Sequence, residues 1–149
     1  MSKILSIVFI GALLALIPFF FFFIGLKIHF IDPHQIKEYY NAIFFYNMPW
    51  EMCGYLGLVL GILFVLPKSL YYGAFVFLAV LGASLTMFIP SVVDDVSHEL
   101  FIKKSFHIKK GKHLYKGTLL YEGQDHYYFV KDDTNRTITF KKEEVDETY

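Results

Sequence analysis

The chain has 149 residues, of which 55% are hydrophobic, and it contains 17 Phe and 11 Tyr. This apolar content exceeds what a soluble domain of this length needs for its core. The formal net charge is zero, but residues 99–149 hold nine Lys and one Arg against nine acids, so charge collects near the C-terminus. A single cysteine, Cys53, excludes a disulfide framework or a cysteine-based metal site within one chain.

Three hydrophobic stretches predict membrane-spanning helices, at residues 4–26, 51–66 and 70–89. The first has no charged residue and, at about 1.5 Å per residue, is long enough to cross a hydrocarbon core of about 30 Å. A cleaved signal peptide is the alternative, but the stretch is too long and no A-x-A-like site follows it. The second is short for a perpendicular helix, so we expect Trp50 and Glu51 at the interface.

Residues 33–46, between the first two spans, predict an amphipathic helix that lies in the membrane interface. Asp32 is a suitable N-cap, Pro33 suits the first helical position, and Gln35 completes a capping-box spacing. Apolar residues then recur at helical spacing, namely Ile36, Tyr39, Tyr40, Ile43 and Phe44. A soluble helix packed on the following β module is the alternative.

From Leu100 onward the hydrophobic period changes to two, which predicts β-strands. Turn-forming residues separate four candidate strands, at residues 102–109, 114–121, 126–131 and 137–141. About 45 residues is near the lower limit for an independent core, so we expect the sheet to curl into a small SH3-like or Sm-like barrel, or to be completed by a neighbouring subunit. The predicted fold class is therefore membrane α plus small β. It divides into a transmembrane domain (1–98), a β module (99–142) and a mobile acidic tail (143–149).

Small residues on two of the predicted spans indicate close helix packing. The second span carries a GxxxG motif and an additional glycine, and the third carries a similar set; together they are Gly54, Gly57, Gly61, Ala79, Gly82 and Ala83. The first span offers Gly11 and Ala15 at the same spacing. The contact could lie within one chain, between copies in a homo-oligomer, or with a different membrane protein.

A lysine-rich stretch without an acid opens the β module. It lies where a membrane-anchored module meets anionic headgroups, and each lysine near that surface contributes about 1 kcal/mol. The predicted lipid-binding or partner-binding residues are Trp50, Lys103, Lys104, Lys109, Lys110 and Lys112. A solvated edge strand guarded by lysines is the alternative. A single Arg and a nearly neutral module make nucleic-acid binding unlikely.

No motif in the sequence identifies a reaction, a metal or a cofactor. The six histidines lack a ligand spacing, and the densest titratable cluster, an acidic collar of Asp94, Asp95 and Glu99 with His98, also suits the solvated start of a helix. The predicted spans hold almost no ionisable residue, which argues against an ion-coupled carrier. We therefore predict no enzyme activity, no metal and no cofactor.

These patterns favour a non-enzymatic integral membrane interaction protein, such as a small subunit, a sensor, or an immunity or inhibitor protein of a membrane complex. A small oligomeric channel and a membrane-surface enzyme that uses the acidic collar are the alternatives. The high Phe, Ile and Lys usage with one Arg indicates an AT-rich bacterial genome, and hence the inner (plasma) membrane. Six lysines near span ends favour a cytoplasmic C-terminus, against two that favour the reverse.

Overall fold

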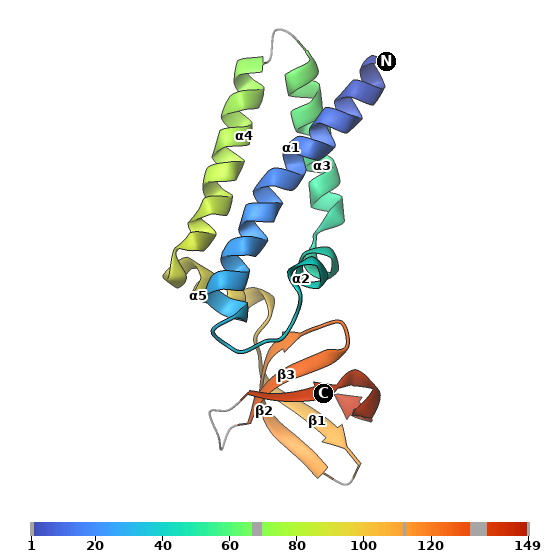
Figure 1. Ribbon diagram of the computed structural model, residues 1–149, viewed down its shortest axis with the longest axis vertical. Helices are drawn as coiled ribbons and strands as arrows, with labels where there is room; N and C mark the ends of the chain where they lie inside the picture. Colours follow the sequence, from blue (N-terminus) through green and yellow to red (C-terminus); the bar gives the residue numbers. More distant parts are fainter. Residues whose placement is uncertain (1, 67–69, 112, 132–136, 149) are drawn as a thin grey trace.

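In the computed structural model, the described residues are 2–66, 70–111, 113–131 and 137–148. A helical N-terminal part is followed by a small antiparallel sheet, and the N-terminus lies at the end of the helices far from the sheet (Figure 1). The helical elements are α1 (Lys3–Leu26), the π-helical turn η1 (Lys27–Ile31), α2 (Tyr40–Asn47), α3 (Trp50–Val65), α4 (Leu70–Leu85), the 3-10 turn η2 (Thr86–Phe88) and α5 (Pro90–Leu100).

Within the described residues, two helices are long and apolar enough to cross a membrane: Lys3–Ile31, with 29 residues, and Leu70–Phe88, with 19. The helix α3 has only 16 residues. It becomes a third span only if it is counted together with α2, to which it is bent by 81°. Large apolar side chains such as Ile4 and Phe75, each 74% exposed, cover the outside of these helices. Two or three helices suited to the bilayer therefore indicate a multi-pass membrane protein.

The segment 33–46 does not form the single interfacial helix that the sequence predicts. Only α2, which begins at Tyr40, is helical there. Asp32 ends the first helix instead of starting the second, since its N–H donates to the Lys27 carbonyl at 2.9 Å and its carboxylate pairs with the Lys27 ammonium. Gln35 follows with φ 57°, in the left-handed region that ends helices. The capping-box spacing was therefore misleading.

The sheet contains β1 (Lys103–Lys110), β2 (His113–Glu122), β3 (His126–Lys131), β4 (Thr137–Lys141) and β5 (Glu147–Thr148), and a 3-10 turn η3 (Lys142–Glu144) joins the last two strands. All neighbours are antiparallel, in the order β4-β3-β2-β1-β5. The four predicted strands are confirmed, but a fifth was missed. The barrel prediction is wrong because, among the described residues, no pairing joins β4 to β5, so the sheet stays open.

The acidic C-terminal residues, which we expected to be mobile, supply the fifth strand. Glu147 lies opposite Lys109 in the ladder, and their side chains form an ion pair at 3.2 Å. The Asp146 carboxylate accepts a hydrogen bond from the Gly111 N–H at 2.7 Å. The lysines of β1 therefore hold the acidic tail against the sheet.

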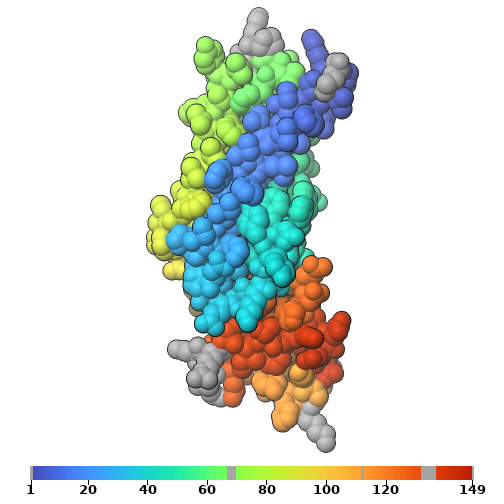
Figure 2. Space-filling model, viewed as in Figure 1, coloured from blue at the N-terminus to red at the C-terminus, as the bar shows by residue number. Residues whose placement is uncertain are grey.

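The two faces of the sheet pack against different partners. One face has its own small cluster, centred on Ile108, Phe129 and Phe140. The other packs on the helices through an aromatic series in which ring centroids lie 5.9 Å apart from Phe30 to Phe101 and 5.4 Å apart from Phe101 to Tyr121. Tyr121 belongs to the same buried cluster as residues of α1. One hydrophobic core therefore continues from the helices into the sheet, and the segment between α1 and α3 fills the junction (Figure 2).

Candidate functional site

An open cleft of about 860 Å³ lies where the helical part meets the sheet. Its volume is within the range of small-molecule binding sites. Three walls form it: the loop after η1, the end of α5, and the helix-facing side of the sheet. The residues that line it are Pro33, His34, Gln35, His98, Ile102, Lys104, Thr118, Leu120, Val130 and Thr137. We refer to it as the junction cleft.

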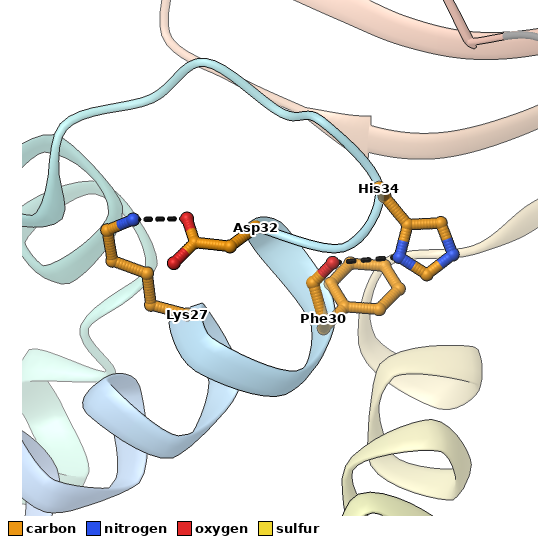
Figure 3. Close-up of polar contacts among 4 residues, drawn as sticks. All are labelled: Lys27, Phe30, Asp32 and His34. Atoms are coloured by element: carbon orange, nitrogen blue, oxygen red, sulfur yellow. Dashed lines mark hydrogen bonds and ion pairs between the residues drawn. The ribbon is translucent and has the colours of Figure 1, made fainter.

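His34 is fixed in the first wall by contacts with the end of the first helix. Figure 3 shows its Nδ1 donating to the Phe30 carbonyl. This hydrogen bond is 2.8 Å long, and the centroids of the two rings lie 4.7 Å apart. The other ring nitrogen, Nε2, points away from Phe30. The Thr137 hydroxyl donates to the His34 carbonyl at 3.3 Å, which ties this loop to β4. The imidazole is therefore held in one orientation with one nitrogen available.

A β-bulge brings Lys104 into the cleft. Lys103 lies opposite Leu119, and Phe106 lies opposite Gly117, so two residues of β1 stand against one of β2. Within the bulge, Ser105 has φ 58°, which is rare for a residue with a side chain. Bulges redirect side chains in this way. In a regular strand, Lys104 would share the face of Phe106, whereas here it lines the junction cleft.

The predicted basic stretch is largely neutralised by acids from elsewhere in the chain. Lys103 pairs with Glu122 at 3.5 Å, and Lys109 and Lys110 pair with acids of the C-terminal segment. Lys104 has no such partner in the part of the chain that the structure describes. Lys112 lies outside the described residues. Of the four predicted lysines that the structure describes, three therefore pair with acids and the fourth, Lys104, lines the cleft.

The predicted helix-packing residues fall into two groups. Gly57 and Gly61 lie directly against α1: a Cβ added to Gly61 would come within 2.1 Å of the Ile7 carbonyl oxygen, and one added to Gly57 within 3.3 Å of Gly11. This contact is therefore within one chain. The other group faces outward, since a Cβ at Gly54 or Gly82 would meet nothing within 4 Å, and Ala79 and Ala83 are exposed.

Trp50 lies apart from the junction cleft, at the start of α3. It is 51% exposed, and its ring stacks on Phe45 with the centroids 5.9 Å apart. It borders a second, apolar groove of about 650 Å³ between α1 and α3, next to Gly54. The aromatic residue is therefore exposed, as an interfacial anchor requires, but it shares no site with the lysines.

A second polar cluster lies on the same side of the sheet, around Glu38. A Cβ at Gly123 would come within 2.1 Å of the Glu38 carboxylate, so the absence of a side chain makes room for this group. Burial raises the pKa of the Glu38 carboxyl, which nearby His126 partly opposes. Burial also raises the pKa of Tyr121, to about 12, and its hydroxyl accepts a hydrogen bond from Asn47 at 2.9 Å. Asn47 and Tyr121 are therefore hydrogen-bonded to each other inside the junction, and the partly buried Glu38 lies near Tyr121 and His126.

The acidic collar does not come together as a site. Asp94, Asp95 and Glu99 are exposed on α5, while Val93 and Ser97 face the core. Among the described residues, no three His, Cys, Asp or Glu side chains are grouped so that they could hold a metal ion. Of the collar cluster, only His98 lines the junction cleft.

No known family matches this chain. Comparisons with curated proteins and with solved structures also find no match.

Sequence reasoning proposed Lys104 as a binding residue and named His98 within the acidic collar, but it did not bring them together with the other residues of the junction cleft. The sequence offers a weak signal for the histidines, since each lies beyond the end of an apolar helix, His34 by three residues and His98 by ten. The threonines of the sheet face, by contrast, are no different in sequence from other strand residues.

Proposed function

We propose that this chain is a non-enzymatic integral membrane interaction protein, in which the helices anchor the chain and the sheet docks a ligand or partner at the membrane surface. The observation that carries the proposal is the continuous core from α1 through Phe30, Phe101 and Tyr121 into the sheet. A module joined by a flexible linker would sample many orientations, whereas this one is held against the helix ends.

The chemistry of the junction favours binding over catalysis. The described residues that line the junction cleft include histidines, a lysine and threonines but no carboxylate. The nearby acids Asp94, Asp95 and Glu99 are exposed on α5, where they are solvated. An acid–base site also needs its base hydrogen-bonded to a nucleophile and oriented by a third group, and neither histidine has this arrangement among the described residues of the cleft. The cleft supplies donors that recognise a ligand, and it is the docking site we propose.

The outward-facing small residues of α4 favour a second interaction within the bilayer. Gly57 and Gly61 are used inside the chain, but Ala79, Gly82 and Ala83 remain exposed. Small residues permit close approach of another helix where lipid gives little driving force. We propose that a second copy of the chain, or a different membrane protein, packs here.

For the orientation, we propose a cytoplasmic C-terminus in the inner membrane. The N-terminal end of α1 and the sheet lie at opposite ends of the helical part (Figure 1). Most lysines near span ends belong to the sheet side, and lysines favour the cytoplasm. A reporter fused after residue 149 that is active only outside the cytoplasm would reverse this orientation.

Purification of the full chain in mild detergent, with measurement of its mass and of co-purifying molecules, tests the proposed function. We expect Thr118→Trp, which fills the junction cleft, to reduce the bound material, while Asp95→Asn and Glu99→Gln leave it unchanged. Circular dichroism of each variant checks its fold. Loss of biological function from Asp95→Asn alone, in a folded protein that keeps its bound partners, would contradict the non-enzymatic assignment.

A further inference from the structure

The junction cleft has the chemistry of an anion site. Three of its side chains, His34, His98 and Lys104, carry or accept a proton on nitrogen, and the described residues around them offer no carboxylate as a partner. The hydroxyl of Thr118 lines the same cleft, whereas the hydroxyl of Thr137 already donates to the His34 carbonyl. Phosphate oxygens accept hydrogen bonds from this set of groups, and the bonds are strongest where a donor is charged.

The ion pairs of β1 single out Lys104. Its neighbour Lys103 has a carboxylate within 3.5 Å, and Lys109 has one within 3.2 Å. The bulge turns Lys104 away from these acids and toward Thr118. Lys104 is exposed, so water solvates its ammonium in the free protein, and an anionic ligand in the cleft can pair with it without displacing a carboxylate of the described residues.

The position of the cleft along the helices indicates which anion reaches it. The apolar helix Lys3–Ile31 has 29 residues and is therefore about 44 Å long. This length matches a bilayer with its headgroup regions included, about 40–45 Å. His34 follows the last residue of that helix by three positions, and its loop forms the cleft wall. A helix of this length along the bilayer normal would bring its end, and the cleft beside it, into the headgroup region.

We propose that the junction cleft binds the phosphate of an anionic phospholipid headgroup, with Lys104 and His98 as donors and, when its imidazole is protonated, His34 Nε2 as a third donor. This inference rests on the proposed docking function and names its ligand. In a bilayer, such a lipid would bridge α5, the loop after η1 and the sheet, and so fix the sheet at the surface.

Titration of the full chain in neutral detergent with dihexanoyl phosphatidylglycerol, followed by native mass spectrometry, tests the inference. We expect binding that exceeds that of zwitterionic dihexanoyl phosphatidylcholine and that falls about tenfold in Lys104→Gln, because one charge-assisted hydrogen bond is lost. Lys103→Gln is the matched control, since this exposed lysine lies on the same strand with a carboxylate partner. His98→Gln should weaken binding in the same direction as Lys104→Gln.

Equal losses in Lys103→Gln and Lys104→Gln would overturn the inference, because the lipid would then respond only to overall charge. Absence of any preference for phosphatidylglycerol over phosphatidylcholine would also overturn it. If glycerol phosphate binds as tightly as the lipid, the ligand of the cleft is a soluble phosphate ester and not a lipid headgroup. If the lipid fails to bind but the chain still carries its co-purifying partner, only the inference fails. If the chain does not remain in the bilayer, the proposed function fails as well.

Discussion

The helical part and the sheet are stabilised by opposite means. Helices α1 and α3 touch through backbone, where Gly11, Gly57 and Gly61 have no side chain to separate them. The sheet instead packs through large rings, of which Tyr121 and Phe129 are almost fully buried. The helices use few side chains inward and expose apolar ones outward, while the sheet buries its aromatic residues and exposes charges. The first arrangement suits lipid and the second suits water, which agrees with the proposed position of the junction at the membrane surface.

The largest expected effect comes from the residue that joins the two regions. Phe30 is 1% exposed and stacks on Phe101. We expect Phe30→Ala to destabilise the fold by about 3–5 kcal/mol and to separate the sheet from the helices. Hydrogen exchange of the full chain in nanodiscs measures this as faster exchange across α5 and β2. Protection as high as in the wild type would show that the sheet is held by other contacts.

The next effect tests backbone packing in the helices. A Cβ at Gly61 would overlap the Ile7 carbonyl oxygen at 2.1 Å, whereas one at Gly54 meets nothing within 4 Å. We expect Gly61→Ala to destabilise the helical part by about 1–3 kcal/mol through overpacking. Gly54→Ala on the same helix should be neutral or slightly stabilising, because Ala favours the helix. Equal thermal unfolding temperatures for the two variants in detergent would refute the close contact of α1 with α3.

A smaller effect concerns the polar group in the aromatic junction. Tyr121→Phe removes the acceptor of the Asn47 hydrogen bond, but Asn47 also donates to the Ile43 carbonyl at 2.9 Å. We therefore expect a loss of about 1 kcal/mol.

The pH dependence of the same variant sharpens this test. Burial raises the pKa of Tyr121 from 10.0 to about 12. The folding stability that the buried neutral phenol contributes is therefore fully present below pH 10 and is lost as the pH rises toward 12. Denaturant unfolding as a function of pH should show a smaller alkaline loss in Tyr121→Phe. An unchanged alkaline profile would mean that the phenol is not buried in the native protein.

The smallest effect concerns the acidic tail on the sheet. Hydrogen bonding to Lys110 lowers the pKa of Glu144 below its ordinary value of 4.5. A carboxyl group whose pKa is lower in the folded state stabilises that state. This stability is present above the pKa of the unfolded chain and is lost as the pH falls through the pKa of the folded state. We expect the tail to stay attached to the sheet at neutral pH and to detach only in acid, below pH 4.5. Amide hydrogen exchange in β5 measures this detachment. Lys110→Gln should shift detachment to higher pH, and no shift would exclude the ion pair as its cause.

Strong local periodicity accounts for what the sequence predicted. The bounds of β3 and β4 agree with the predicted strands because alternation and turn residues mark them clearly. The first apolar helix was equally clear. The prediction of an interfacial helix was wrong because Asp32, which suits an N-cap, instead ends the preceding helix. In that position it forms an ion pair with Lys27. Local spacing alone cannot distinguish these two uses of an aspartate.

The candidate site was less predictable because long-range contacts create it. The tail acids neutralise Lys109 and Lys110 from more than 30 residues away, which composition does not reveal. The bulge that redirects Lys104 breaks the alternation on which strand prediction depends. The intramolecular role of Gly57 and Gly61, as opposed to a contact between chains, also required the position of α1.

Depth measurement by spin labels tests most directly the claim that the sheet is held at the surface of a membrane crossed by the helices. Cys53 is the only cysteine, so single labels can be placed in a Cys53→Ala background of the full chain in lipid bilayers. Collision rates with oxygen and with a water-soluble nickel complex should place a label at Phe75 in the hydrocarbon, one at Glu99 at the headgroups and one at Thr139 in water near the surface. Nickel-accessible labels at both Phe75 and Glu99, or a label at Thr139 as deep as that at Phe75, would contradict the account.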